Sequence, residues 1–233
     1  MTEAIPARRP RAFQPVAVAR LDAKQALPGD ALHVWWWPEP LQPRVEGRRA
    51  RTDAILRTLL ARYLPLAPDE LRFRRGPKGR PSLDHPGAPD FNLSDTAGGT
   101  VVAVVPAGRV GIDIERVDRR LPVQRLATRW FAPGEAQALA RLDADAGRAA
   151  FLRHWTAKEA ACKATGTGIF GYLHGWRFAI DDGTTPPQAL ELPEDAGETS
   201  RWRFHRVAPV PSHTVVLACR DAPGEPEGFA VVG

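Results

Sequence analysis

The chain has 233 residues, of which 43% are hydrophobic and 25% charged, a balance typical of a soluble globular protein rather than of a disordered or fibrous one. The 32 Lys and Arg residues outnumber the 27 Asp and Glu residues, which favours an anionic partner but does not choose between a phosphorylated small molecule, an acidic protein and nucleic acid. No apolar run reaches membrane-spanning length, the N-terminal residues lack the apolar segment that a signal peptide needs, and Cys162 and Cys219 form no CxxC motif. The sequence therefore predicts a cytoplasmic protein without a membrane segment.

The first half of the chain begins with residues 1–30, which are rich in Pro, Ala and Arg and predict an irregular leader. Residues 32–37 predict a strand that contains three consecutive Trp residues. Such residues could also stack on nucleic-acid bases, but alternate residues of a strand face opposite sides, which favours a core strand with one aromatic ring outside. Residues 48–64 predict a helix with an apolar stripe and several arginines, which could simply be solvated.

Three further strands and a basic turn complete this half. The strands are expected at 71–74, 91–96 and 100–105, and the turn at 76–81. The Pro-Ala-Gly turn at 106–108 is the predicted boundary between an N-terminal half, residues 31–107, and a C-terminal half, residues 108–222.

The second half is expected to mix strands with long helices. Its strands are predicted at 110–115, 176–180, 202–207 and 214–219, and its helices at 122–131, 133–142 and 147–165. Residues 223–233, which contain Pro-Gly-Glu-Pro, predict an unstructured tail. Two halves of similar size that both mix strands and helices predict an α+β fold.

The strand at 110–115 carries two acids on one face. Its alternation sends Ile112 and Ile114 into a core and places Asp113 and Glu115 together on the opposite side. Two carboxylates that close repel each other, so either a pKa rises or the pair needs a cation. Taken alone, the motif is more typical of an edge strand with a solvated acidic face.

A third acid lies on the last predicted helix. Residues four apart on a helix are neighbours, so Glu159 and Lys163 share a face, and a solvated ion pair would explain this stretch by itself. Together with Asp113 and Glu115, however, Glu159 makes a set of three carboxylates. Such a set suits Mg²⁺, which prefers hard oxygen ligands and shares its shell with substrate phosphates. Zinc fits poorly, because the six His residues show no ligand spacing.

Five motifs in the chain resemble those of the 4′-phosphopantetheinyl transferases, in the long type that activates surfactin synthetase. In family order they are Gly-Arg-Pro at 79–81, Phe-Asn-Leu-Ser at 91–94, Gly-Ile-Asp-Ile-Glu at 111–115, Phe-Ala-Pro-Gly-Glu at 131–135 and Trp-Thr-Ala-Lys-Glu-Ala-Ala-Cys-Lys at 155–163. The third and fifth motifs together are highly specific, whereas any one alone would be weak. The resemblance covers about residues 45 to 220. It implies two similar α/β halves, each a small antiparallel sheet packed with helices, with coenzyme A bound between them.

The same resemblance implies roles for individual residues. It implies that Asp113, Glu115 and Glu159 hold Mg²⁺. Catalysis would rest on Glu159, Lys163 and Asp113, with Glu159 accepting a proton or positioning the group that does. The residues implied in binding coenzyme A are Arg48, Lys78, Gly79, Arg80, Pro81, Ser94, Asp95, Thr96, Lys158 and Lys163.

The reaction that the resemblance implies moves the 4′-phosphopantetheine arm of coenzyme A onto a serine of an apo acyl or peptidyl carrier protein. The leaving group is 3′,5′-ADP. Carrier proteins are acidic, which suits the basic balance of this chain. Because long members of the family hold both halves in one chain, a monomer is expected. Neither a nucleic acid nor a membrane is expected as a partner.

One residue departs from the family pattern. Asp95 stands where the family commonly has His after Asn-x-Ser, and a carboxylate there would repel phosphate unless a cation pairs with it. It could be a metal ligand, a base or a turn residue. Its position just before Gly98-Gly99 favours the turn, because short oxygen-bearing side chains often bond their own backbone there.

Two other classes of function fit the residues less well. A nucleic-acid-binding module would leave the three carboxylates unexplained, because acids repel a phosphate backbone unless a metal intervenes. A glycosidase would need an acid and a base across a sugar cleft, and a lack of metal dependence would indicate it.

Overall fold

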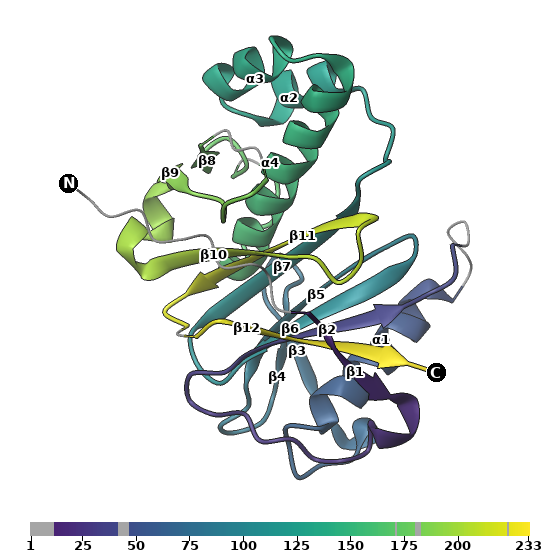
Figure 1. Cartoon of the computed structure of the whole chain (residues 1–233). Helices are drawn as coiled ribbons and strands as arrows, with labels where there is room; N and C mark the ends of the chain where they lie inside the picture. The colour runs from purple at the N-terminus through teal and green to yellow at the C-terminus, as the bar shows by residue number, and fades with distance from the viewer. Residues whose placement is uncertain (1–11, 42–46, 171, 180–182, 223) are drawn as a thin grey trace, which may run out of the picture.

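The computed structural model describes residues 12–41, 47–170, 172–179, 183–222 and 224–233. In this part of the chain a five-stranded and a three-stranded sheet pack with helices, beside two small hairpins (Figure 1). The predicted α+β class is confirmed. Residues 1–11 of the expected leader, Ile180 of an expected strand and Pro223 of the expected tail lie outside the described residues. No helix among the described residues is long and apolar enough to cross a membrane.

Both sheets are built from one repeated arrangement. The first half supplies β2 (Leu32–Pro38), α1 (Arg48–Ala61), β5 (Asp90–Thr96) and β6 (Gly99–Val105). The second half supplies β7 (Arg109–Arg116), α4 (Ala144–Thr165), β10 (Trp202–Val207) and β11 (His213–Arg220). The strands lie in the order β2-β6-β5 in one sheet and β7-β11-β10 in the other, with antiparallel neighbours. Each half is therefore a strand, a long helix and a hairpin whose second strand is central.

The remaining elements are short. They are β3 (Phe73–Arg75), β4 (Pro81–Leu83), α2 (Val123–Trp130), α3 (Pro133–Ala140), β8 (Arg177–Phe178) and β9 (Ala189–Glu191), with 3₁₀ turns at 18–20, 68–70, 194–196 and 199–201. Helix α4 begins earlier than expected because Asp143 caps it, its carboxylate accepting hydrogen bonds from the backbone nitrogens of Asp145 and Ala146.

The segments expected to be an irregular leader and an unstructured tail both join the larger sheet. Strand β12 (Pro226–Val232) lies between β1 (Gln14–Ala17) and β2 and runs parallel to both. The prediction of an unstructured tail is therefore wrong, and the leader is not irregular throughout. Phe229 is buried and stacks on Trp35, with 4.7 Å between the ring centroids, so burial of apolar surface outweighs the turn signal of the preceding Pro and Gly residues. This sheet is mixed rather than purely antiparallel.

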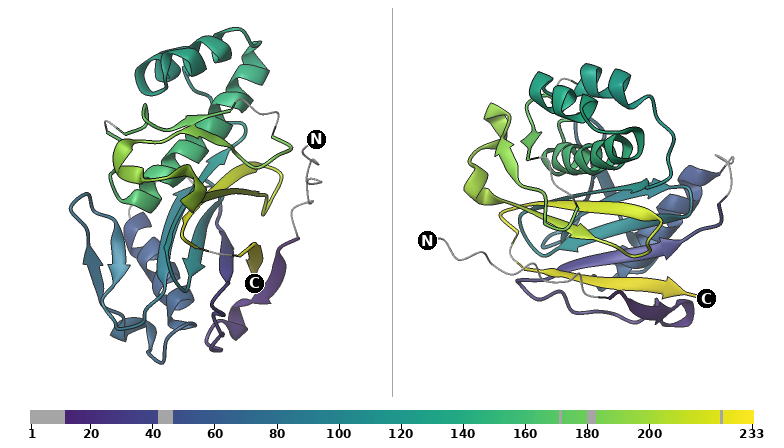
Figure 2. Two further views of the ribbon diagram at one scale, coloured as in Figure 1. Left: turned by 90° about the vertical axis from the view of Figure 1, so that its left-hand side faces the viewer. Right: turned by 45° about the horizontal axis from the view of Figure 1, so that its top comes forward.

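The two sheets pack face to face, with α1 outside one and α4 outside the other. Val34 and Trp36 of β2 belong to the same buried cluster as Ile112 and Ile114 of β7, while Trp35 belongs to a second cluster that includes the buried residues of α1. The Trp-rich run is thus a core strand, as expected. Figure 2 shows α2, α3 and α4 gathered on one side of the sheets. The layers leave the face of β7 that carries Asp113 and Glu115 turned toward α4.

Close packing of α4 on β7 depends on Gly111. A Cβ atom at this position would lie 2.0 Å from the backbone oxygen of Ala160 and 2.5 Å from the backbone nitrogen of Ala164. Backbone atoms of the helix therefore occupy the place of a side chain. This approach brings Glu159 and Lys163, which are on the same helix, over the acids of β7.

We expect Gly111→Ala to lower the free energy of unfolding by about 3 kcal/mol, because no flexible side chain can yield and the helix itself must shift. Urea denaturation followed by circular dichroism measures the effect. Gly134→Ala is the matched control, since a Cβ there meets nothing within 4 Å, and this variant should be neutral or slightly stabilised. Equal midpoints for the two variants would contradict the close approach.

Candidate functional site

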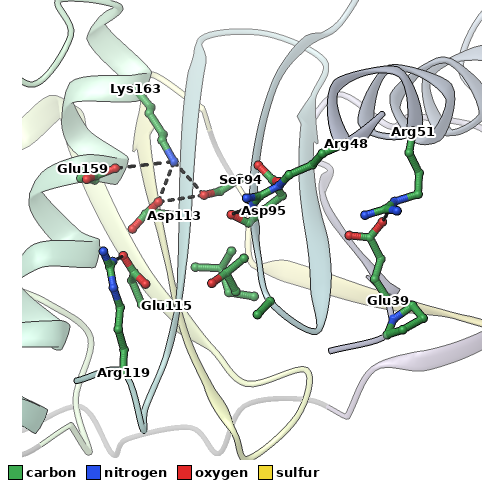
Figure 3. Close-up of a pocket in the computed structure, with 14 residues that line it drawn as sticks. Glu39, Arg48, Arg51, Ser94, Asp95, Asp113, Glu115, Arg119, Glu159 and Lys163 are labelled. Atoms are coloured by element: carbon green, nitrogen blue, oxygen red, sulfur yellow. Dashed lines mark hydrogen bonds and ion pairs between the residues drawn. The ribbon is translucent and has the colours of Figure 1, made fainter. Parts of the chain in front are cut away.

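A cavity of about 480 Å³ lies where the two halves meet (Figure 3). Its walls come from the first turns of α1, the end of β5, the end of β7 and one face of α4. The lining residues that carry charge or a hydroxyl are Glu39, Arg48, Arg51, Ser94, Asp95, Thr96, Asp113, Glu115, Arg119, Glu159 and Lys163. The structure therefore brings together all three predicted metal ligands and all three predicted catalytic residues.

Asp113 is at the centre of a hydrogen-bonded group. Its Oδ1 atom accepts hydrogen bonds from Ser94 Oγ at 2.8 Å and from Lys163 Nζ at 2.6 Å. Lys163 Nζ also donates to Ser94 Oγ at 2.8 Å and lies 3.8 Å from Glu159 Oε2. The other oxygen, Oδ2, is buried and has no hydrogen-bond partner among the described residues. A buried anionic oxygen without a partner is costly, so this atom is suited to an incoming cation or donor.

The side chains of Asp113 and Glu115 are buried, which excludes a solvated acidic face on β7. Burial, and secondly the charge of Asp113, raise the pKa of Glu159 to about 8 and that of Glu115 to about 7. Glu115 pairs with Arg119, whose positive charge opposes this effect. Burial alone would lower the pKa of Lys163, but Asp113 and Glu159 raise it above its ordinary value.

The acids do not form a ready-made metal cage. Within the described ranges no three Asp, Glu, His or Cys side chains form a group that could hold a metal ion. Lys163 and Arg119 instead pair with the carboxylates. Two observations nevertheless fit Mg²⁺, namely the unpaired Oδ2 atom of Asp113 and a donor set made of oxygen alone. The residues can accommodate the ion if the two cations turn toward an anionic ligand.

Asp95 lies in β5 and not in a turn, so the favoured sequence interpretation is wrong. Its carboxylate pairs with the guanidinium of Arg48, which also donates from Nη2 to the backbone oxygen of Asp95 at 2.9 Å. The pair separates two cavities, because both residues line each of them. Arg48 thus screens the acid that stands in place of the expected His.

Lys158 does not reach the cavity, and its predicted contact with coenzyme A is wrong. The side chain is fully buried, and Nζ donates to Glu135 Oε2 at 2.7 Å, to the backbone oxygen of Leu173 at 3.1 Å and to that of Trp176. Successive helical residues are about 100° apart, so the neighbour of Glu159 faces the other way. All three ammonium donors are used inside the protein.

The basic turn at 78–81 contributes fewer residues to the site than the sequence indicates. The Arg80 guanidinium makes a bidentate pair with Asp90 at 2.7 and 3.0 Å and also donates to backbone oxygens, including that of Lys163. It therefore ties the two halves together instead of facing the cavity. Neither Lys78 nor Gly79 lines the cavity or the groove beside it, and only Pro81 lines that groove.

A second hollow, which we call the apolar groove, adjoins the cavity beyond the Arg48–Asp95 pair. Its volume is about 1120 Å³. Its apolar wall is formed by Leu56, Phe73, Pro81 and Leu93, and its rim carries Arg49, Arg57 and Arg75. The sequence motifs do not contain most of these residues, because the groove forms only when α1, β3 and β5 meet. Arg119, which lines the cavity, was also missed, although its position four residues after Glu115 could have indicated it.

Comparisons with known proteins match the chain to one family. Residues 109–219 match the family model of the 4′-phosphopantetheinyl transferase superfamily. A putative 4′-phosphopantetheinyl transferase of Synechocystis is 36% identical over 70% of this chain and 65% of its own length. The 4′-phosphopantetheinyl transferase HetI of Nostoc is 34% identical over 58% of this chain and 56% of its own length. The 4′-phosphopantetheinyl transferase AcpT of Salmonella typhimurium is 33% identical over 60% of this chain and 69% of its own length.

The fold, the site and these similarities define the class of the protein: the chain belongs to the 4′-phosphopantetheinyl transferase superfamily. The matched regions span less than two thirds of the Synechocystis and Nostoc relatives.

Proposed function

We propose that the protein transfers the 4′-phosphopantetheine arm of coenzyme A to a serine of an apo acyl or peptidyl carrier protein, with release of 3′,5′-ADP and with Mg²⁺ as cofactor. The observation that carries the proposal is the convergence of Asp113, Glu115, Glu159 and Lys163 in one cavity. These residues come from the two most specific motifs of the chain. We further propose that it is the long type, whose two halves lie in one chain, since both sheets repeat one strand order.

The shape of the site suits coenzyme A. The apolar groove has room for the adenine ring against Phe73 and Leu93, and the adjoining cavity has the charges that a pyrophosphate needs. Arg48 lines both hollows and lies where the nucleotide would pass from one to the other. Ser94 and Thr96 line the cavity on the β5 side and can bond to phosphate oxygens.

In the proposed reaction the serine oxygen forms a bond to the β-phosphorus of coenzyme A, and the bond from that phosphorus to the bridging oxygen of 3′,5′-ADP breaks. When bound by Asp113, Glu115 and Glu159, Mg²⁺ would neutralise charge on the pyrophosphate. Lys163 would donate to a phosphate oxygen and so stabilise the charge of the leaving group. Glu159 lines the same cavity and, in its ionised form, would accept the serine proton.

The partner and setting of the enzyme stay predictions. An acidic carrier protein matches a chain of net charge +5, and the repeated arrangement within one chain favours a monomer. A cytoplasmic location, where coenzyme A and apo carrier proteins occur together, is also expected. Nucleic acid is disfavoured as a partner because Arg51 and Arg57 of α1 pair with Glu39 and Asp53, and Arg62 is buried.

The direct test is to incubate the protein with coenzyme A, Mg²⁺ and purified apo carrier proteins of several classes and to measure their intact masses. The expected result is a mass increase equal to one phosphopantetheine group, lost when the acceptor serine is replaced by Ala. Excess EDTA should abolish the increase, and adding back Mg²⁺ should restore it. Full transfer in excess EDTA would refute the requirement for a metal ion. Transfer to none of the carrier-protein classes would refute the proposed activity.

Arg48→Ala is expected to raise the KM for coenzyme A about tenfold or more. The charge-assisted contact that it removes is worth about 1.5–3 kcal/mol, and Asp95 is left unscreened beside the phosphates. The KM for the carrier protein is the internal control and should change little. A larger rise in the KM for the carrier protein than for coenzyme A in Arg48→Ala would place Arg48 in the partner surface.

Asp95→Ala should keep kcat/KM within about tenfold, because it removes a repulsive charge and leaves Arg48 free.

A further inference from the structure

His213 joins the two halves of the protein beside the cavity. This residue begins β11, and its side chain is buried. Its Nε2 atom lies 3.0 Å from the backbone oxygen of Ala97, which belongs to the turn between β5 and β6 and lines the cavity. His213 comes from the second half and Ala97 from the first, so this contact crosses from one sheet to the other.

The hydrogen bond between these two residues has a defined direction. A carbonyl oxygen only accepts, so Nε2 of His213 carries the proton and donates it to Ala97. The other ring nitrogen, Nδ1, lies 2.9 Å from Ser212 Oγ and can accept from that hydroxyl. Burial lowers the pKa of His213, which keeps the imidazole in the neutral form that this arrangement needs. The two neighbours therefore hold one tautomer of the ring.

The turn between β5 and β6 is shaped to accept this contact. Gly98 has a φ of 100°, a conformation that favours glycine, and a Cβ atom there would lie 3.1 Å from Cε1 of the His213 ring. The backbone oxygen of Gly98 accepts a hydrogen bond from the backbone nitrogen of Glu39 at 2.9 Å. The first half thus holds one carbonyl group of the turn, and the second half holds the other through His213.

The contact links the two walls of the cavity. Residues 95–97 belong to the wall on the β5 side. On the opposite side, His213 pairs in the sheet with Arg116, which directly follows Glu115 in β7. The ring is therefore attached to the strand that carries the acids, and its hydrogen bond fixes the distance from that strand to the β5 wall. A shift of about 1 Å would leave the contacts within each wall in place but would misalign groups that act together.

We propose that His213 is a positioning residue, whose hydrogen bond to Ala97 sets the separation between the β5 wall and the acids of β7 and so aligns the bound donor with the acceptor. The proposal rests on the proposed function for the reaction that this alignment serves. His213 does not line the cavity itself, so it acts through the backbone of the turn and not by touching the ligand. Because the contacts within each wall stay in place, the rate of transfer should depend on His213 more than the affinity for the nucleotide does.

The test compares His213→Phe, which keeps a ring of similar size without the donor, with His213→Gln, whose amide nitrogen can take the place of Nε2. In single-turnover kinetics with saturating coenzyme A, His213→Phe should transfer about tenfold more slowly than the unmodified protein. The Kd of 3′,5′-ADP, measured by calorimetry, should change by less than about threefold, and His213→Gln should recover the rate to within about threefold. Ser212→Ala is the matched control, because it removes the other hydrogen bond of the ring, and its rate should stay within about twofold of the parent.

Hydrogen exchange followed by mass spectrometry gives a second readout that needs no turnover. Backbone amides of residues 95–100 should exchange about tenfold faster in His213→Phe than in the unmodified protein, and at the parent rate in His213→Gln. If His213→Phe does not fold, His213→Leu takes its place, because its side chain is smaller than imidazole and cannot overpack the site.

Three results would overturn the positioning role of His213. They are equal rate losses in His213→Phe and His213→Gln, a larger effect on the Kd of 3′,5′-ADP than on the rate, and unchanged exchange of residues 95–100 in His213→Phe. If the unmodified protein transfers nothing, the proposed function fails, and the exchange measurement still decides whether His213 holds the turn.

Discussion

Replacing Glu159 by Gln is expected to lower kcat for phosphopantetheine transfer by about a hundredfold or more, equivalent to about 2.7 kcal/mol of transition-state stabilisation. The substitution keeps the shape of the side chain but removes its negative charge and its ability to accept a proton. Glu159 lies 3.8 Å from Lys163, which in turn bonds to Asp113, so both the proposed metal site and the proposed proton acceptor are affected. Rapid-quench single-turnover kinetics with saturating coenzyme A measure the chemical step.

Two comparisons separate the role of Glu159 from a general loss of negative charge. Glu39→Gln removes a carboxylate from the opposite end of the same cavity, where Glu39 pairs with Arg51, and should lower kcat less than tenfold. Binding of Mn²⁺ in the presence of coenzyme A, followed by electron paramagnetic resonance, should weaken in Glu159→Gln and not in Glu39→Gln. Similar kinetic losses in the two variants would mean that only the overall charge of the cavity matters.

Lys158→Met is expected to lower the free energy of unfolding by about 3–5 kcal/mol, because it leaves the carboxylate of Glu135 buried without its partner charge. Glu135 Oε1 accepts from the backbone nitrogen of Phe178 and Oε2 from that of Ala132, so the acid is fixed in place and cannot turn to solvent. The ammonium also lies over the ring of Phe131 at 4.8 Å. The pair thus joins α3, α4 and the segment leading into β8.

Urea denaturation measures this effect, with Lys78→Met as the control for loss of an exposed ammonium, expected within about 0.5 kcal/mol of the parent. The double variant Lys158→Met/Glu135→Gln should be more stable than Lys158→Met alone, because it no longer buries an unpaired charge. If Lys158→Met keeps full stability but raises the KM for coenzyme A, then Lys158 contacts the nucleotide, as the sequence predicts.

The acids of the site could be predicted from sequence because local periodicity controls them. Alternation along β7 separates Asp113 and Glu115 from Ile112 and Ile114, and the structure confirms both faces. The helical spacing likewise places Glu159 and Lys163 together. Only the approach of α4 to β7 through Gly111 brings the two motifs into one cavity, and no periodicity within either element contains that contact.

The incorrect predictions concern partners that are distant in the sequence. The sequence indicates that Lys158 and Arg80 are basic residues near catalytic motifs, but it does not show that Glu135 and Asp90 already neutralise them. Asp95 is similar, because its partner Arg48 comes from a helix of the same half but far along the chain. Charge counts from a sequence therefore overestimate the cations that a ligand can use, and the structure identifies those that remain.

The parallel strand β12 has a consequence for the synthesis of the chain. Leu32 of β2 pairs with Pro226 of β12, so one edge of β2 stays open until nearly two hundred more residues have been translated, which takes roughly 10–40 s at the usual rate of 5–20 residues per second. During that interval an apolar strand that contains Trp35 and Trp36 presents unpaired backbone groups, the kind of edge that recruits other chains. We therefore expect the nascent protein to be prone to aggregation while it is still on the ribosome, and chaperones that bind emerging apolar strands should raise its yield.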